Sequence, residues 1–565
     1  MAKTQRNCTS VRTLLLVVLA AWSVCASAAE PLSHDPVVWY ANDNQPSEMP
    51  EFHEPRAMNY AMSSFVARPF SRFWHPGRFF RRVGTGDTSR FASDVNALDE
   101  VVNSTWFTNR IGVRELSAEE LTYGPGLVKE YRDGPDRSSP WTIIGAKTAG
   151  VTPGFRIKDG NGDTWLLKFD PPSHPGMTIR AGVVANLIFH AIGFNTPVDR
   201  VVIFDRQDLI VGEGARMKVG RDGVVAMTEA NLDSILTATG SIFDGEYHAL
   251  ASRYLDGIPV GPFGDQDTRH DDSNDHIKHE NRRELRGLKV FAAWLNHFDT
   301  KMQNSLDMYV GEPGEGYVEH YLIDFASTLG AYGDQAVKRF GYEFGLDLWP
   351  SVGRTVTLGF VEDTWVQLER PAGLSEVGIF DVATFEPNRW KPDLPHSAMA
   401  SMNDLDGYWA AKIVASFSES DLRVLLAQGK YRDSEAMEFL LQGLLGRRDK
   451  IASYWFNQVP PLDHFVVRGD RIVFSDLAVM HGYAEPSETT YRYRAALANQ
   501  DRHTEDRSSW QTINAPSFSY ENRSGDRPNY EFVMVEVQVK RDGGWSQPTK
   551  AYFSRRDGHT VAVER

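Results

Sequence analysis

Residues 292–329, AAWLNHFDTKMQNSLDMYVGEPGEGYVEHYLIDFASTL, contain the pattern that decides the fold of this chain. The segment HFDTKMQN at 297–304 has the form H-x-D-x-K-x-x-N, in which an amide follows an acid by five residues. The segment YLIDFA at 321–326 is an apolar strand followed by an acid. A phosphoryl-transfer enzyme needs an acid to accept the proton of the attacking hydroxyl, and oxygen ligands for Mg²⁺ on the nucleotide phosphates. These two segments can supply both.

This constellation resembles the catalytic loop and the metal-binding aspartate of the protein-kinase-like superfamily. The resemblance is strongest to atypical branches, namely HipA-type toxin kinases, CotH-type spore-coat kinases, Golgi secretory kinases and type II phosphatidylinositol 4-kinases. It covers roughly residues 140–345. It implies ATP, or another nucleoside triphosphate, and Mg²⁺ as cofactors.

The resemblance gives each polar residue of the pattern a role. It implies that Asp299 is the catalytic base and that Lys301 neutralises charge on the transferred phosphoryl group. Asn304 and Asp324 would hold Mg²⁺. His297 is expected to pack under the loop rather than to take part in chemistry. The alternative for the set is a polar turn between a helix and a loop, with Asp324 as a capping residue.

Strands at 155–158 and 164–169 are predicted to form a hairpin, because the turn between them, DGNGD, accepts positive φ. The period of two places Lys168 between apolar neighbours on a central strand, where a cation is costly unless it meets an anion. This position resembles the kinase lysine that binds the nucleotide phosphates; the alternative is a solvated edge lysine. The loop that contains Lys147 and Gly150 lies where kinases cover those phosphates, although its glycines do not match the kinase fingerprint.

Residues 179–193, IRAGVVANLIFHAIG, are predicted to form an apolar helix that ends at Gly193. Kinases carry a glutamate on the corresponding helix, where it holds the strand lysine. This helix contains no acid, and Gly182 lies near the expected position of that glutamate. A glycine inside a helix costs roughly 1 kcal/mol relative to alanine, so it is not there to favour the helix. Either another acid orients Lys168, or the nucleotide site is degraded.

An acidic loop with several histidines follows at 270–280, HDDSNDHIKHE. Some of its side chains could ligate a divalent metal. This set comprises His276, His279, Glu280 and either Asp271 or Asp272. The alternative is a solvated helix start with Asp275 as its N-cap.

The first residues predict export. Cations, an apolar run at 14–22 and the small residues ASAA at 26–29 form a secretory signal peptide, with cleavage after Ala28 or the next residue. A lipid anchor on Cys25 is disfavoured by the poor lipobox before it. Cys8 and Cys25 both precede the cleavage site, so the periplasmic or secreted protein is expected to have no disulfide and no cysteine metal site. No other segment has the length and apolarity of a transmembrane helix.

Length and composition indicate a globular protein of two to four domains. The chain has 565 residues, of which 41% are hydrophobic and 12% aromatic, enough for large cores. Its net charge of −15 argues against nucleic acid as a partner, because phosphate contacts require a basic face.

The expected fold class is α+β. We expect a two-lobed protein-kinase-like fold, with a small β-rich lobe and a larger helical lobe, between an N-terminal extension and a C-terminal β-sandwich. The expected boundaries are 1–28 for the signal peptide, 29–135 for the extension, 136–255 for the small lobe, 256–460 for the helical lobe and 464–565 for the sandwich. Strands at 197–204 and 210–217 would complete a five-stranded small lobe, and 249–255 would pass between the lobes.

Three functions are compatible with these patterns. The first is an exported kinase-like phosphotransferase that moves the γ-phosphoryl group of a nucleotide to a hydroxyl of a protein or small molecule. The second is a pseudokinase, a binding or scaffold protein without catalysis, which the acid-free helix favours. The third is a metal-dependent hydrolase that uses the cluster at 270–280. In each case the C-terminal β-domain is expected to dock a protein or a glycan.

Overall fold

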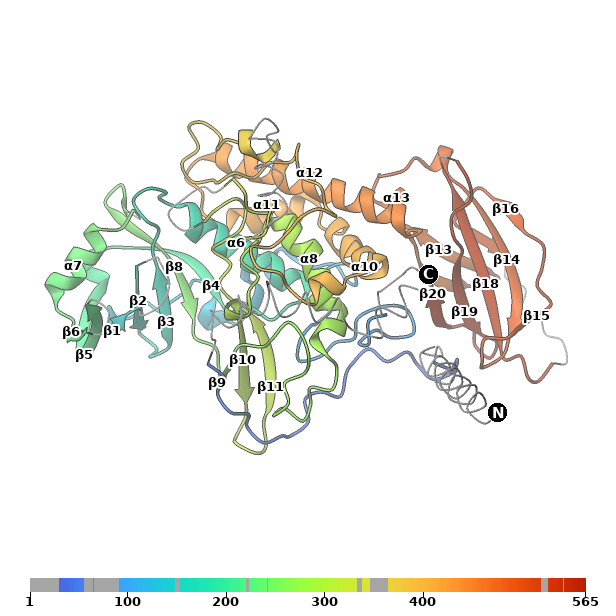
Figure 1. Cartoon of the computed structure of the whole chain (residues 1–565), viewed down its shortest axis with the longest axis horizontal. Helices are drawn as coiled ribbons and strands as arrows, with labels where there is room; N and C mark the ends of the chain where they lie inside the picture. The colour runs from blue at the N-terminus through green and yellow to red at the C-terminus, as the bar shows by residue number, and fades with distance from the viewer. Residues whose placement is uncertain are drawn as a thin grey trace, which may run out of the picture.

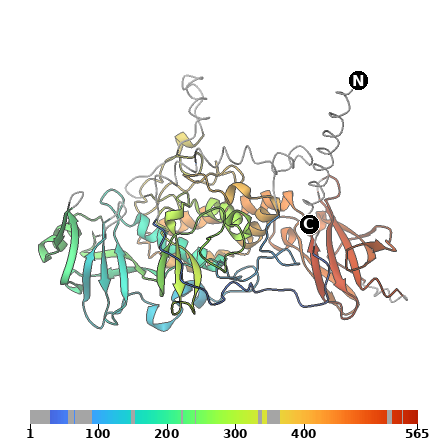
Figure 2. The same cartoon turned by 60° about the horizontal axis from the view of Figure 1, so that its bottom comes forward.

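The structure is a computed structural model of the chain (Figures 1 and 2). It describes residues 30–54, 65, 91–147, 153–219, 223–240, 242–332, 338–345, 364–519, 527–541 and 543–565. The expected signal peptide at 1–28, with Cys8 and Cys25, and the loop residue Gly150 lie outside the described residues. Within those residues, the structure contains no helix with both the length and the apolarity to cross a membrane.

An eight-stranded sheet forms one end of the molecule, at the left of Figure 1 in teal and green. The strands are β1 (Trp141–Ala146), β2 (Gly154–Lys158), β3 (Thr164–Lys168), β4 (Asp199–Phe204), β5 (Leu209–Val219), β6 (Gly223–Ala226), β7 (Ile242–Phe243) and β8 (Glu246–Arg253). Their order is β4-β8-β3-β2-β1-β5-β6, and β7 pairs with β8. The predicted alternation in β3 is confirmed, since Trp165 and Leu167 are fully buried while Leu166 and Lys168 are partly exposed.

This sheet is larger than the predicted five-stranded lobe. The expected passage at 249–255 is wrong, because most of it belongs to β8, which lies between β3 and β4. The four central residues of β8 are all buried, so both of its faces are covered, as in an interior strand. The short β6 and β7 supply the remaining two strands.

The helices surround the largest hydrophobic core, in the middle of Figure 1. They are α5 (Ala118–Tyr123), α6 (Met177–Ile192), α8 (Arg283–Leu295), α10 (Asp404–Ala415), α11 (Glu419–Ala427), α12 (Ser434–Gln458) and α13 (Leu477–Met480). Another helix, α7 (Glu229–Thr237), lies beside the large sheet. The predicted end of α6 at Gly193 is confirmed. Ser418 and Asp433 cap the N-termini of α11 and α12. Asn296 ends α8 in the left-handed conformation (φ 51°), which asparagine adopts more readily than most residues.

A hairpin follows α8 and pairs with a third strand. β9 (Ile258–Gly261), β10 (Ser305–Val310) and β11 (Tyr317–Leu322) form an antiparallel sheet in the order β11-β10-β9. Ser305 at the start of β10 pairs with Leu322 at the end of β11. The two segments that carry the predicted site, one before β10 and one after β11, therefore lie side by side.

Residues 462–565 form two sheets with a common core, at the right of Figure 1. One contains β12 (Leu462–Arg468), β13 (Arg471–Asp476) and β17 (Ser517–Ser519). The other contains β14 (Thr490–Ala498), β15 (Thr504–Glu505), β16 (Gln511–Ile513), β18 (Phe532–Lys540), β19 (Thr549–Ser554) and β20 (Thr560–Glu564). Phe465 and Phe474 of the first sheet pack in the same cluster as Val535 and Phe553 of the second, as in a sandwich.

Residues 30–54 run from the C-terminal sheets to the three-stranded sheet of β9, β10 and β11 (Figure 2). Leu32 donates its N–H to the carbonyl of Gln500 in the C-terminal region, over 2.8 Å. Further along, Ser47 bonds to Gly316 of the hairpin and His53 to Val260 of β9. The extension is therefore held against the body by backbone hydrogen bonds.

The chain is thus a mixed α+β protein, as predicted, and its largest sheet has eight strands. The sheet meets the helical body at α6, which packs against β4 and β8. The candidate site lies close to this junction, because Lys168 ends β3 and Gly182 of α6 faces Ala326.

Candidate active site

Three of the predicted side chains meet in the loop after α8. Lys301 Nζ lies 2.9 Å from Asp299 Oδ1. Asn304 donates its side-chain N–H to the Asp299 carbonyl (2.7 Å) and to Asp299 Oδ2 (3.1 Å). The Asp299 carboxylate is 19% exposed, so it is held in place but remains accessible. Because Asn304 uses its nitrogen here, its amide oxygen is left for another ligand.

Asp324 is brought to this loop by the hairpin. Ile323 donates its N–H to the carbonyl of Asn304 over 3.0 Å, which joins the end of β11 to the start of β10. Asp324 has a left-handed backbone conformation (φ 61°), which is uncommon outside glycine and is enriched at functional positions. Its carboxylate Oδ1 lies 3.1 Å from Lys168 Nζ of β3.

Lysines dominate the electrostatics of Asp324. Burial alone would raise the pKa of Asp324, but the ion pair with Lys168 and the positive charges of Lys147 and Lys301 together hold it below its ordinary value. Lys147 lies on the loop after β1 and bonds through its N–H to Gly154 (2.8 Å). Burial and the neighbouring charge of Lys168 lower the pKa of Lys147 to about 8, although Asp324 opposes this shift. The positive charges of three lysines therefore act on one carboxylate, an arrangement that suits a polyanion.

Aromatic side chains pack against one another beneath the loop that carries Asp299 and beside the turn that carries Asp324. Phe325 stacks on Phe189 of α6 with ring centroids 5.1 Å apart. His297 contacts both rings, at 5.6 Å from Phe189 and 5.7 Å from Phe325. Its Nδ1 is 3.3 Å from the carbonyl of Ser327, and burial lowers the pKa of His297. The predicted packing role of His297 beneath the loop is confirmed.

The acid-free helix has a structural explanation. A Cβ atom on Gly182 would lie 3.0 Å from Leu250 and 3.5 Å from the Cα of Ala326. Glycine therefore allows α6 to approach the turn that follows Asp324 closely. Asp324 itself pairs with Lys168, so the acid that orients this lysine in the structure comes from the end of β11 and not from α6.

Two acids near the site were missed by the sequence analysis. Asp199 of β4 is buried within electrostatic reach of Lys168, and burial raises its pKa to about 6 despite a hydrogen bond from Ser252. Asp393 donates its N–H to the carbonyl of Phe298 (2.8 Å) and forms an ion pair with Arg339 over 3.3 Å. Burial raises the pKa of Asp393, and the nearby Asp299 adds to this shift. Neither belongs to a recognisable motif, since each is set in place only by tertiary contacts.

The predicted grouping of His276, His279 and Glu280 as metal ligands is wrong. His279 is buried with both ring nitrogens engaged, Nδ1 with the Gly264 carbonyl and Nε2 with Asp275 Oδ2, each at 2.7 Å. Glu280 accepts the N–H of Asp267, and His276 is exposed. The alternative of Asp275 as an exposed cap is also wrong, because this residue is buried beneath Arg282 and His279.

Comparison with known proteins does not assign this chain to a family. No protein-family model matches the chain, and no curated protein matches it. Among solved structures, the crystal structure of a Helicobacter pylori proinflammatory kinase, CtkA, is similar over 54% of this chain and 94% of that chain, with 12% identity and a TM-score of 0.28. A TM-score this low does not establish a shared fold.

Proposed function

We propose that the protein is a kinase-like phosphotransferase, which uses Mg²⁺ and ATP or another nucleoside triphosphate to phosphorylate a hydroxyl group. The observation that carries this proposal is the ion pair between Lys168 of β3 and Asp324 after β11, beside the Asp299–Asn304 loop. Residues from three separate segments thus bring cations, carboxylates and an amide to one place. These are the groups that phosphoryl transfer requires.

The donor set fits magnesium. Asp324 offers a carboxylate and Asn304 an amide oxygen, and Mg²⁺ prefers one or two such oxygens together with phosphate oxygens. When bound, Mg²⁺ would neutralise charge on the phosphates. Lys168 and Lys147 would then contact the phosphates.

The remaining residues act on the acceptor hydroxyl. Asp299 takes the hydroxyl proton as the acceptor oxygen forms its bond to the γ-phosphorus and the bond to the β,γ-bridging oxygen breaks, which leaves the nucleoside diphosphate. Lys301, 2.9 Å from Asp299, stabilises charge on the transferred group. The acceptor is a protein or a small molecule. Export, with cleavage of residues 1–28, is a further part of the proposal and rests on the sequence alone.

The alternative is a pseudokinase, a binding protein that keeps the nucleotide site without catalysis. The absence of an acid from α6 favours it, because Asp324 would have to serve both Lys168 and Mg²⁺. Both functions use the same nucleotide site, but only the kinase transfers the γ-phosphoryl group to an acceptor.

A thermal-shift titration tests the nucleotide site. We expect Mg²⁺-ATP to stabilise the wild-type protein by about 2.7 kcal/mol at a ligand concentration one hundred times Kd. Asp324→Asn should abolish this stabilisation, because it removes the carboxylate that would bind Mg²⁺. Glu315→Gln, at the exposed tip of the same hairpin, is the matched control and should bind as the wild type does. Equal stabilisation of Asp324→Asn and wild type would refute the site. Transfer of ³²P from γ-labelled ATP then distinguishes the kinase from the pseudokinase.

Nucleotide affinity should also depend on the protonation of Lys147. The pKa of Lys147 is lowered to about 8, so the side chain loses its charge as pH rises through that value. We expect Kd for the nucleotide to increase about fivefold across this range, the effect of roughly 1 kcal/mol for one solvated charge pair. Lys147→Arg keeps its charge at high pH, so this increase in Kd should disappear in the variant. Titration calorimetry at pH 7 and pH 9 measures Kd. If Kd for Lys147→Arg increased as much as Kd for the wild type, Lys147 would not be the residue whose charge binds the phosphates.

A further inference from the structure

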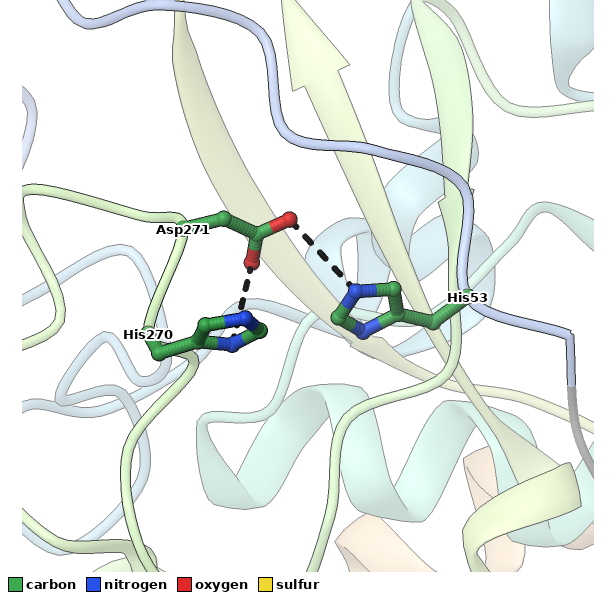
Figure 3. A group of neighbouring side chains, drawn as sticks. All are labelled: His53, His270 and Asp271. Atoms are coloured by element: carbon green, nitrogen blue, oxygen red, sulfur yellow. Dashed lines mark ion pairs between the residues drawn. The ribbon is translucent and has the colours of Figure 1, made fainter.

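A second group of ligand-type side chains lies where the N-terminal extension crosses the body (Figure 3). His53 Nε2 is 3.5 Å from Asp271 Oδ2, and His270 Nδ1 is 3.9 Å from Asp271 Oδ1. The two imidazole rings are stacked, with centroids 5.7 Å apart. One ligand atom from each residue lies within 4.8 Å of the others. Among the residues that the structure describes, this is the only group of three or more such side chains with that spacing.

The backbone of the extension is fixed beside this group. His53 donates its N–H to the carbonyl of Val260 in β9 over 3.1 Å. A Cβ atom at Gly261, which has φ +98°, would lie 2.2 Å from the carbonyl oxygen of His53. Glycine at this position therefore permits the close approach that brings His53 to the loop containing His270 and Asp271.

The carboxylate of Asp271 is also held in position. Glu51 donates its N–H to Asp271 Oδ2 (3.0 Å), and the buried guanidinium of Arg269 approaches Oδ1 at 3.2 Å. That approach does not have hydrogen-bond geometry, so Oδ1 is buried without a hydrogen-bond partner among the described residues. Arg269 in turn bonds to Asp307 (2.9 Å) and to the Glu51 carbonyl (2.7 Å). Such secondary contacts orient a metal ligand.

We propose that His53, His270 and Asp271 bind a divalent transition-metal ion of the zinc type, which fastens the N-terminal extension to the body. Two imidazoles and one carboxylate are characteristic ligands of these ions. Ligand atoms around tetrahedral zinc are about 3.3 Å apart, given bonds of about 2.0 Å. One ligand atom from each of the three residues already lies within 4.8 Å of the others, so side-chain rotations can bring them to that spacing. The His270 side chain is 83% exposed, so water can complete the coordination. Mg²⁺ is not expected here, because it prefers oxygen ligands.

This site shares no residue with the proposed phosphotransfer site, and its test does not depend on catalysis. Titration calorimetry with ZnCl₂ on the untagged full chain, first freed of metal by a chelator, should give one binding site. Because both histidines are at least 41% exposed, His53→Ala and His270→Ala should fold normally, which circular dichroism checks. Each variant should lose zinc affinity at least tenfold. His276→Ala removes an exposed histidine of the same loop that is not in the group, and should bind as the wild type does.

Cobalt provides a second measurement that reports the ligands directly. Co²⁺ bound to the wild type should show d–d absorption bands that are absent from His53→Ala and unchanged in His276→Ala. The proposal is overturned if the wild type binds no stoichiometric zinc. It is also overturned if His53→Ala binds zinc with unchanged affinity, because the extension would then contribute no ligand.

Discussion

Asp299→Asn should retain Mg²⁺-nucleotide binding and lose phosphoryl transfer by about 10²- to 10⁴-fold, the usual contribution of a general base. The asparagine has the size of the aspartate and can still accept a hydrogen bond from Asn304, which lies 3.1 Å from the carboxylate. It cannot take a proton from the acceptor hydroxyl. The effect should therefore appear in the rate of transfer and not in the thermal shift produced by nucleotide.

Single-turnover transfer from γ-³²P-ATP measures this rate once an acceptor, or autophosphorylation, is detected. Glu315→Gln on the β10–β11 hairpin again serves as the control and should transfer at the wild-type rate. Transfer by Asp299→Asn within tenfold of wild type would mean that another group accepts the proton. Asp393 would then be the next residue to replace, since it lies near enough to Asp299 for the charge of Asp299 to raise its pKa.

Local sequence patterns predicted the elements that carry the site. The alternation around Lys168, the hairpin that contains it, and the apolar α6 with Gly193 at its end all depend on neighbours in sequence, and all are confirmed. Hydrophobic periodicity and turn chemistry specify such features. The resemblance to kinases assigned Asp299 and Asn304 to one site, and their side chains are in contact.

Features that depend on distant partners were not predictable in this way. The buried strand β8 was mistaken for a connection, because a short apolar run does not specify which strands flank it. No local pattern indicates that Asp324 pairs directly with Lys168, or that His53 approaches the loop at His270. These contacts follow from the tertiary arrangement alone, and the wrong metal set at 276–280 has the same cause.

A buried ionic network joins the C-terminal sheets to the helices and to the extension. Arg565 Nη2 lies 2.9 Å from Asp463 Oδ1, and its Nε lies 3.3 Å from Asp99 Oδ2. Lys412 of α10 contacts Asp463 at 2.8 Å and also pairs with Glu100. The Arg565 side chain is 1% exposed and that of Asp463 is 7% exposed. Although burial raises the pKa of Asp463, the charges of Arg565 and Lys412 hold it far below its ordinary value.

Arg565→Met should therefore lower the free energy of unfolding by up to about 3–5 kcal/mol, the cost of removing one partner of a buried ion pair. Lys412, 2.8 Å from Asp463, stays in place and offsets part of this loss. Methionine keeps much of the arginine side-chain volume, so the loss reports charge rather than a cavity. Arg527→Ala is the matched control, because its pairs with Glu505 and Asp506 on the same domain are about half exposed and such pairs contribute only about 0–1 kcal/mol. Chemical denaturation followed by tryptophan fluorescence measures both variants.

The pH dependence of the stability lost in Arg565→Met shows whether the loss comes from charge or from packing. Because the folded-state pKa of Asp463 lies below that of the unfolded chain, its ion pairs stabilise the fold above about pH 3.9, and this stabilisation is lost as pH falls further. The difference between wild type and Arg565→Met should accordingly be full at pH 7 and smaller at pH 3. If Arg565→Met were no less stable than Arg527→Ala at pH 7, the network would not hold the C-terminal sheets to the body. A difference that stayed constant down to pH 3 would instead indicate lost packing around Tyr408, whose ring lies 4.7 Å from the Arg565 guanidinium.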